Sequence, residues 1–295
     1  MKRPSPIVFF KQSLKSQSYY SDEIINIYLL RPLAAMIVWL LYPTRVTPNH
    51  VTGLVIIFGL SAAVVYTINT PSAIAVGGIL VCVKDIFDDA DGQLARAKEL
   101  YSRRGRFLDS IGDFVVDAAV FSSVTYVVFQ SYPTVVTIIL GAASLLGITL
   151  RVSYHVFYQA SFLHLEERYK LNRIIEEVTE EDRKGDPIAL RLQIVFNWIY
   201  GWQDKFMYRL DRWCRGSTIT EKQFRAWYSD KTGLRISGLL GFGTEFALLT
   251  VCSLFNQLHL YLVLNVLMMN GIWSIGIIYR RFVLLNKVAS QISNP

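Results

Sequence analysis

Residues 88–113 read DDADGQLARAKELYSRRGRFLDSIGD, and this polar stretch separates two long apolar runs. Five of its residues are aspartates. A carboxylate placed in apolar surroundings without a partner is costly, so acidic residues at the edge of membrane-length segments indicate a site that binds something cationic. The stretch therefore predicts two neighbouring helices that meet at an acidic site.

The aspartates fall on one face of each predicted helix. At about 100° per residue, a helix over 85–97 would gather its polar and small residues within a sector roughly 140° wide. These residues are Asp85, Asp88, Asp91, Gly92, Ala95 and Arg96. On the next helix, a second stripe recurs every four residues and consists of Gly105, Asp109, Asp113 and Asp117. Because the two helices are adjacent and antiparallel, the stripes are expected to face each other.

Opposed carboxylates of this kind predict a metal site. Oxygen ligands suit Mg²⁺, Mn²⁺ or Ca²⁺ and argue against zinc or copper. Two ions about 3.5–4 Å apart, bridged by shared carboxylates, would also bind a diphosphate. Gly92 and Ala95 leave room beside the helix backbone, and Arg96 adds a positive charge for phosphate. The pattern indicates a site for a nucleotide diphosphate.

Simpler explanations compete for the same residues. The aspartates could form a solvated helix end paired with Arg103, Arg104 or Arg106. Gly92 and Ala95 taken alone are typical of close helix packing. The four histidines are scattered without metal-ligand spacing, so they are expected to pack or to lie in the interface. Asp89 lies beside the pattern, and Asp117 is expected to support the site rather than bind metal.

The composition indicates an integral membrane protein. The chain of 295 residues is 52% hydrophobic and 18% charged, and its mean hydropathy is +0.33. These values are too apolar for an ordinary soluble domain. The net charge of +7 then suits an anionic membrane surface, and we expect no nucleic-acid partner.

Six apolar segments are long enough to cross a bilayer, which needs about 20 residues. They lie at 50–69, 73–97, 106–129, 134–158, 236–256 and 258–279. Three short loops, TINTPS, QSYP and NQLH, contain no Lys or Arg, whereas basic residues collect in the opposite loops and at both ends. By the positive-inside rule, the active site and both termini are expected on the cytoplasmic side.

The predicted fold is an all-α integral membrane protein of six transmembrane helices in four parts. Residues 1–46 form a cytoplasmic or interfacial segment with an amphipathic helix, because Arg31 and Pro32 interrupt the apolar run there. A seventh crossing in this segment is the alternative. Residues 47–160 carry the first four spans and the acidic motif, 161–235 form a cytoplasmic insert of short helices, and 236–295 hold the last two spans and a tail.

The N-terminal residues and the cysteines indicate no signal peptide, disulfide framework or zinc site. Four apolar residues before Lys11 are too few for a signal-peptide core. Cys82, Cys214 and Cys252 are widely spaced and odd in number, so neither a disulfide framework nor a zinc site is expected.

The acidic stretch resembles the signature of the CDP-alcohol phosphotransferase family. The signature places an aspartate, an Asp-Gly pair, an Ala-Arg pair, a glycine and two further aspartates at set spacings. This chain matches every position, with Asp88, Asp91, Gly92, Ala95, Arg96, Gly105, Asp109 and Asp113. The likeness covers most of the chain but covers 161–235 poorly.

The resemblance implies a metal-dependent transfer of a substituted phosphate from a CDP-alcohol to a second alcohol, with release of CMP. It implies two ions, Mg²⁺ or Mn²⁺, bound by Asp88, Asp91, Asp109 and Asp113. Asp113 would also be the general base, and the nucleotide would contact Gly92, Ala95, Arg96 and Gly105. Family likeness also suggests a homodimer in the lipid bilayer.

The acceptor site is less defined by the sequence. Arg151 lies within the fourth span and Arg235 opens the fifth, and intramembrane arginines suggest an anion site. If they share a cavity, they predict a phosphorylated acceptor; snorkelling to the interface is the alternative.

Several functions remain open at this level. The first hypothesis takes CDP-diacylglycerol as the donor and a small polar alcohol as the acceptor in phospholipid biosynthesis. The second reverses the roles, with a soluble CDP-headgroup and a lipid alcohol. A divalent-cation transporter is the alternative from another class, although such sites usually lie at the membrane midplane between repeated halves. A catalytically silent scaffold is disfavoured by the intact set of aspartates.

Overall fold

The computed structural model describes residues 20–166, 176–216 and 220–290, and within these ranges the chain forms helices and no strand. The N-terminal and central helices are η1 (Asn26–Leu30), α2 (Arg31–Leu41), α3 (Pro48–Thr67), α4 (Pro71–Lys98), α5 (Arg103–Ser131) and α6 (Val135–Leu165). The helices of the insert are α7 (Glu180–Lys184), α8 (Pro187–Arg215) and α9 (Glu221–Tyr228). The C-terminal helices are α10 (Lys231–Ser237), α11 (Phe242–Leu254), α12 (Leu258–Leu264), η2 (Asn265–Met269), α13 (Asn270–Ile278), η3 (Tyr279–Leu284) and α14 (Leu285–Ser290). The all-α prediction is confirmed.

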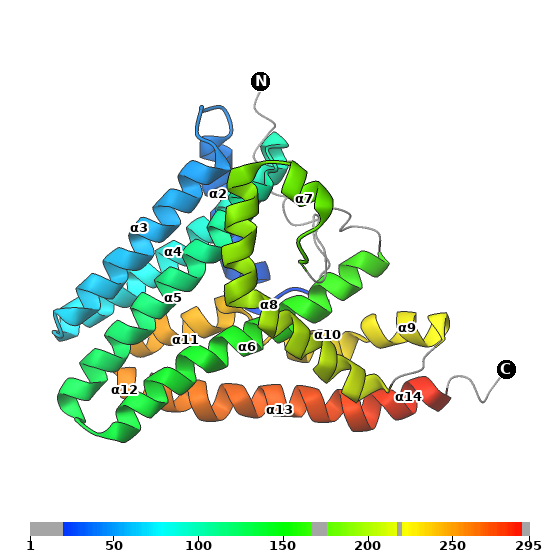
Figure 1. Ribbon diagram of the computed structural model, residues 1–295. Coiled ribbons are helices and arrows are strands. Elements are labelled where there is room, and N and C mark those ends of the chain that lie inside the picture. Colours follow the sequence, from blue (N-terminus) through cyan, green and yellow to red (C-terminus); the bar gives the residue numbers. More distant parts are fainter. Residues whose placement is uncertain (1–19, 167–175, 217–219, 291–295) are drawn as a thin grey trace.

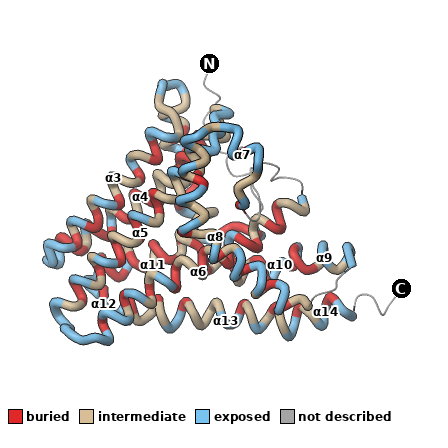
Figure 2. The backbone as a smooth tube through the Cα atoms, viewed as in Figure 1, coloured by how far each residue is buried: buried red, intermediate tan, exposed pale blue. Residues whose placement is uncertain are grey.

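Helices α3, α4 and α5 run side by side, and the C-terminal helices α12 to α14 lie along the opposite side of the molecule (Figure 1). Buried positions follow the facing sides of the central helices, and exposed positions lie mostly on their outer sides (Figure 2). The largest apolar cluster joins α3, α4, α5, α6 and α11. This bundle carries the acidic motif.

Local capping sets where α4 and α5 begin and end. The Thr70 side chain accepts a hydrogen bond from Ala73 N at the start of α4, and Ser102 accepts one from Gly105 N at the start of α5. Glu99 ends α4 in a left-handed conformation (φ 56°). Capping hydroxyls satisfy backbone donors that the first helical turn leaves free. The short connection at 99–102 therefore turns the chain back and brings the two acidic stripes together.

Length and composition support four or five of the expected six membrane spans. Among the described residues, four helical segments are long and apolar enough to cross a membrane, and a bent pair would make a fifth. The four are Pro48–Thr67, Arg103–Ser131, Val135–Leu165 and Leu258–Ser290. Helix α4 does not pass the same test, because Lys84, Asp85 and Asp88 interrupt its apolar run.

The expected span at 236–256 is broken in the structure. Helices α10 and α11 are bent by 41° relative to each other. The intervening residues 238–241 read GLLG, and Gly241 takes an extended conformation as the residue that caps α11. Glycines at a helix end permit such a break. The segment is apolar throughout, so its hydropathy alone predicts one continuous helix.

The N-terminal segment and the insert both pack on the bundle. Ala34 and Val38 of α2 bury against Val51, Ala90 and Leu94. In the insert, α8 is 29 residues long rather than a short helix, and it packs against α5 and α6. The expectations for residues 1–19, 167–175, 217–219 and 291–295, which include the basic N-terminus, lie outside the described residues.

Candidate active site

Three of the predicted metal ligands converge between α4 and α5. Asp88, Asp91 and Asp109 each offer a carboxylate oxygen, and these oxygens lie within 4.8 Å of one another. Asp109 Oδ1 is buried and has no hydrogen-bond partner in the described part of the chain. Three carboxylate oxygens at this separation, beside an unsatisfied oxygen on Asp109, fit a hard divalent cation such as Mg²⁺ or Mn²⁺. A residue of α3 also takes part, because Thr52 Oγ1 donates to Asp91 Oδ2 at 2.6 Å.

The fourth predicted ligand, Asp113, is not a member of this group of three and has a cationic partner. Lys84 Nζ lies 3.0 Å from Asp113 Oδ1, and the lysine side chain is 1% exposed. The rings of Phe242 and Phe246 lie 5.6 and 5.0 Å from the same ammonium group. The structure therefore divides the aspartates into a group of three and one ion-paired carboxylate.

Lys84 lies outside the predicted set of site residues. It stands one residue before Asp85 within the apolar run ILVCVKDIF, inside the span expected at 73–97. A lone lysine in such a run is itself a signal, because an intramembrane cation requires a partner.

The residues predicted to bind the nucleotide line one cavity of about 390 Å³. We call it the loop-side cavity because it lies beside the connection at 99–102. Its lining includes Gly92, Ala95, Arg96 and Gly105, together with Asp91 and Asp109 of the acidic group. A Cβ on Gly92 would meet only the Arg96 guanidinium at 3.5 Å or more, whereas one on Gly105 would lie 2.7 Å from Asn49 Oδ1. Gly105 thus allows close packing against α3, and Gly92 leaves the helix backbone open to the cavity.

A second cavity of about 270 Å³, the acidic cavity, adjoins the same aspartates. Asp22 and Glu23 from the N-terminal segment line it, as do Asp85 and Asp89 of α4. Burial, followed by the nearby carboxylates, raises the pKa of Glu23 to about 8, although a hydrogen bond from Thr244 N opposes this shift. The site predicted from the sequence does not include these N-terminal acids, because more than sixty residues separate them from the motif.

A third cavity of about 310 Å³, the α8 cavity, lies between α5, α6 and α8. Asp113 and Asp117 line one part of it, and Phe157, Phe196 and Phe242 are among the apolar residues that line the rest. Burial raises the pKa of another lining residue, Asp204, to about 6. The cavity thus joins the ion-paired Asp113 to an apolar space.

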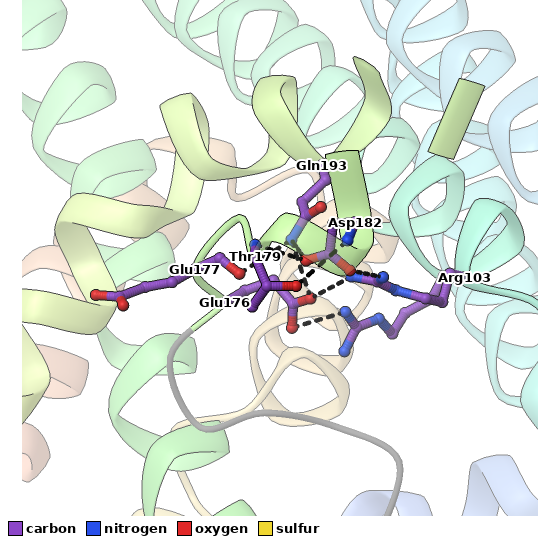
Figure 3. Close-up of polar contacts among 7 residues, drawn as sticks. Arg103, Glu176, Glu177, Thr179, Asp182 and Gln193 are labelled. Atoms are coloured by element: carbon purple, nitrogen blue, oxygen red, sulfur yellow. Dashed lines mark hydrogen bonds and ion pairs between the residues drawn. The ribbon is translucent and has the colours of Figure 1, made fainter. Parts of the chain in front are cut away.

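The insert is attached to the start of α5 by ion pairs. Arg103 bonds to Asp182 and, at 3.0 Å, to Glu176 (Figure 3). Arg106 lies 2.8 Å from Glu176. Gln193 of α8 donates to Asp182 at 3.2 Å. Because Arg103 and Arg106 also line the loop-side cavity, the insert forms part of the surroundings of the site. Asp186 pairs in turn with Arg104, and this hydrogen bond lowers the pKa of Asp186.

The two predicted acceptor arginines lie elsewhere. Arg151 is fully buried. It donates from Nε to Glu245 at 2.7 Å and from a terminal nitrogen to Asn270 Oδ1 at 2.6 Å. Arg235 lies in α10, with its guanidinium 5.6 Å from the centre of the Tyr20 ring. Neither residue is among those lining the acidic or the α8 cavity. Their role in acceptor binding stays a prediction.

The fold and the site together define a class: a helical membrane protein with carboxylates for divalent cations beside a cavity for a phosphorylated ligand. Comparison with known proteins gives the family. Residues 45–204 match the family described as CDP-alcohol phosphatidyltransferase, which is more than half of the chain. The chain therefore belongs to this family, and the resemblance is confirmed.

Two curated relatives are similar over shorter segments. Both are named "Bifunctional IPC transferase and DIPP synthase". The protein from Thermococcus kodakarensis is 32% identical over 105 residues, which are 36% of this chain and 23% of the relative. The protein from Aquifex aeolicus is 35% identical over 79 residues, or 27% of this chain and 18% of the relative. The matched segment thus spans less than a quarter of either relative.

Family membership indicates a type of reaction. Members of the family transfer a phosphate-linked alcohol from a CDP-alcohol, and the helical segments long and apolar enough to cross a membrane agree with a membrane protein of this family. The family is typically dependent on divalent metals, which agrees with the carboxylate group formed by Asp88, Asp91 and Asp109.

Proposed function

We propose that the protein transfers a phosphatidyl group from CDP-diacylglycerol to a small polar alcohol and releases CMP, as a step of phospholipid biosynthesis. The observation that carries this proposal is the shared lining of the loop-side cavity. Gly92, Ala95, Arg96 and Gly105 surround the same space as two carboxylates of the acidic group. A CDP group in that cavity would place its diphosphate against those carboxylates.

The residues of the chain divide the work of binding. Arg96 provides a guanidinium for a phosphate oxygen, and Gly92 lets the nucleotide approach the backbone of α4. Asp88, Asp91, Asp109 and Asp113 would hold two ions, Mg²⁺ or Mn²⁺. When bound, the ions would neutralise charge on the diphosphate oxygens during transfer. The acyl chains would extend into the apolar part of the α8 cavity.

Asp113 is proposed as the general base for the attacking hydroxyl. Its contact with Lys84 Nζ at 3.0 Å holds the carboxylate in one orientation. In this role Asp113 takes the proton from the acceptor hydroxyl as the oxygen attacks the phosphorus. An ordinary aspartate is a weak base, so positioning must contribute most of the rate.

We further propose the arrangement of the chain in the membrane. Helix α4 crosses the bilayer together with the four segments that pass the length and composition test, and α10 with α11 completes six spans. Residues 47–160 form the catalytic part, 161–235 a cytoplasmic insert, and 1–46 an interfacial segment. The site and both ends of the chain then face the cytoplasm, and two copies form a homodimer.

The first test is CMP release by the purified protein in detergent with Mn²⁺ or Mg²⁺. CDP-diacylglycerol is offered with a panel of alcohols, and CDP-choline or CDP-ethanolamine is offered with diacylglycerol. Release with CDP-diacylglycerol supports the proposal, and release with the soluble donors alone would reverse the roles of lipid and headgroup. An absence of CMP with every donor would contradict the function and favour ion transport.

Substitution of Asp113 tests its assigned role. We expect Asp113→Asn to reduce kcat by at least about 100-fold, the usual contribution of a general base. It should bind CDP-diacylglycerol more tightly than Asp88→Asn does, because Asp88 belongs to the group nearest the diphosphate. The exposed Glu180→Gln is the control. An equal loss of nucleotide binding in the two aspartate variants would contradict the base role.

A further inference from the structure

The acidic cavity has no role in the transfer as described so far. It shares Asp91, Gly92, Arg96 and Asp109 with the loop-side cavity, so the two spaces adjoin at the proposed metal ligands. A ligand in the acidic cavity would therefore lie next to the diphosphate of a CDP-alcohol. This is the position that the small alcohol must occupy, whether it arrives free or as the headgroup of the donor.

The charges of this cavity do not suit a phosphate. Apart from the proposed metal ligands, its lining carries four carboxyl groups, Asp22, Glu23, Asp85 and Asp89, and two guanidinium groups, Arg31 and Arg96. Arg31 is already bound to Asp22 at 2.7 Å, and Arg96 is assigned to the nucleotide. A carboxylate repels a phosphate, and a protonated carboxyl group offers it no cation.

The unsatisfied polar atoms of the cavity are hydrogen-bond acceptors. Asp89 accepts one hydrogen bond, from Gln93 Nε2 at 3.5 Å. Asn26 Oδ1 and His155 Nδ1 are buried without a hydrogen-bond partner there, and His155 is 4% exposed. The His155 ring also hydrogen-bonds the backbone of Ser237, and a neutral imidazole that donates through one nitrogen accepts through the other. Buried acceptors of this kind call for donors from a ligand.

We infer that the acidic cavity binds the small alcohol of the reaction, and that this alcohol carries hydroxyl or ammonium donors and no phosphate group of its own. The inference rests on the proposed function and adds the class of alcohol to it. A polyol and an amino alcohol share this chemistry. A phosphorylated alcohol, which the positions of Arg151 and Arg235 predict from sequence, is the opposing outcome.

The test compares alcohols in matched pairs. Glycerol is compared with glycerol 3-phosphate, and ethanolamine with phosphoethanolamine. In a binding experiment, the full-length protein in detergent with Mn²⁺ and CMP is melted in the presence of each compound. We expect the phosphate-free members to raise the melting temperature more than their phosphorylated partners. Greater stabilisation by the phosphorylated members, or none by any compound, would overturn the inference even if no turnover is detected.

Turnover separates the two sources of the alcohol. One reaction uses CDP-diacylglycerol with the free alcohols, and the other uses CDP-glycerol or CDP-ethanolamine with diacylglycerol. CMP release in either reaction supports the inference if a phosphate-free alcohol is preferred by about tenfold or more in kcat/KM. A tenfold preference corresponds to about 1.4 kcal/mol. Preference for a phosphorylated alcohol overturns it while leaving the transferase function intact.

Variants locate the alcohol in this cavity. Asp89→Asn should raise KM for the alcohol about tenfold and leave KM for the CDP-bearing substrate within twofold. Asn26→Leu, from a different element, should act in the same direction, and it serves where Asp89→Asn does not fold. Glu180→Gln on the exposed face of the insert is the control. An unchanged KM for the alcohol in the folded variants would overturn the assignment.

Discussion

A single buried cation, Lys84, stabilises a set of carboxylates that would otherwise repel one another. It contacts Asp113 at 3.0 Å and is 1% exposed. Removing one partner of a buried ion pair leaves an uncompensated charge, which costs about 3–5 kcal/mol. We therefore expect Lys84→Met to lower the free energy of unfolding by about 3–5 kcal/mol, measured by chemical unfolding in detergent.

The paired substitution checks this explanation. Adding Asp113→Asn to Lys84→Met should restore part of the lost stability, because the second change removes the stranded carboxylate. Lys205→Met replaces an exposed lysine of α8 and should change stability little. If the double variant is less stable than Lys84→Met, the carboxylate of Asp113 is not the charge that the lysine balances.

Glu23 gives a pH dependence of stability with a defined sign. Burial and the carboxylates of Asp85, Asp22 and Asp89 raise its pKa from 4.5 to about 8, against the opposing hydrogen bond from Thr244 N. The folded state thus holds the proton more tightly than the unfolded state. Stability from this group is fully present below pH 4.5 and is lost as the pH rises towards 8.

A neutral side chain of the same shape should remove this dependence. We expect the melting temperature of the unmodified protein to fall between pH 5 and pH 8, and that of Glu23→Gln to fall less. At the upper end of this range the variant should be the more stable protein. Parallel melting curves for the two proteins across the range would show that Glu23 is not the titrating group.

At the scale of elements, Gly59 is one of the glycines that allow close contact between α3 and α5. A Cβ on Gly59 would overlap the side chain of Val116, which is 1% exposed. Extra volume in a packed interior costs about 1–3 kcal/mol. Gly59→Ala should therefore destabilise the bundle by about that amount in a thermal unfolding experiment.

Gly53 on the same helix is the matched control. A Cβ at this position meets nothing within 4 Å, and alanine is preferred over glycine inside a helix by about 0.5–1 kcal/mol. Gly53→Ala should thus leave stability unchanged or increase it. Equal destabilisation by both substitutions would indicate that α3 needs glycine for a reason other than contact with α5.

The helices that carry the acidic motif could be predicted because their signals are local. Apolar runs placed α3, α4 and α5 close to their observed bounds, and the spacing of the aspartates predicted that Asp88, Asp91 and Asp109 converge. The run at 134–158 predicted the start of α6 but not its continuation to Leu165. The break at 238–241 was missed because its leucines maintain the apolar run between two glycines.

Contacts between distant segments had no local signal. Gln159 of α6 donates to Asp22 at 2.7 Å across 137 positions of the chain. The attachment of Arg103 to Glu176 and Asp182 likewise depends on where the insert folds back. A periodic pattern within one helix cannot specify such a partner, so the acidic cavity and the surroundings of Arg103 emerged only with the structure.

At the scale of the whole molecule, separate parts of the chain meet around one group of aspartates. The N-terminal segment supplies Asp22 and Glu23 to the acidic cavity. Helix α8 of the insert supplies part of the wall of the α8 cavity. Removal of either part would therefore open a wall of the site, although the aspartates themselves belong to α4 and α5.

The same geometry makes the stability of the molecule depend on divalent metal. Asp88 and Asp91 belong to α4 and Asp109 to α5, so an ion held by all three would join the two helices and relieve the repulsion between their carboxylates. A ligand that binds only the folded state at about a hundredfold excess over its Kd adds about 2.7 kcal/mol. We expect chelation by EDTA to lower the melting temperature of the detergent-solubilised protein, and Mn²⁺ or Mg²⁺ to restore it.

Variants of single carboxylates test which residues hold the metal. Asp109→Asn should lose most of the response to EDTA and metal. Asp204→Asn, which changes a carboxylate of α8 outside the group, should keep this response. The same melting temperature with EDTA and with saturating Mn²⁺ would mean that these carboxylates do not hold a metal in the absence of substrate.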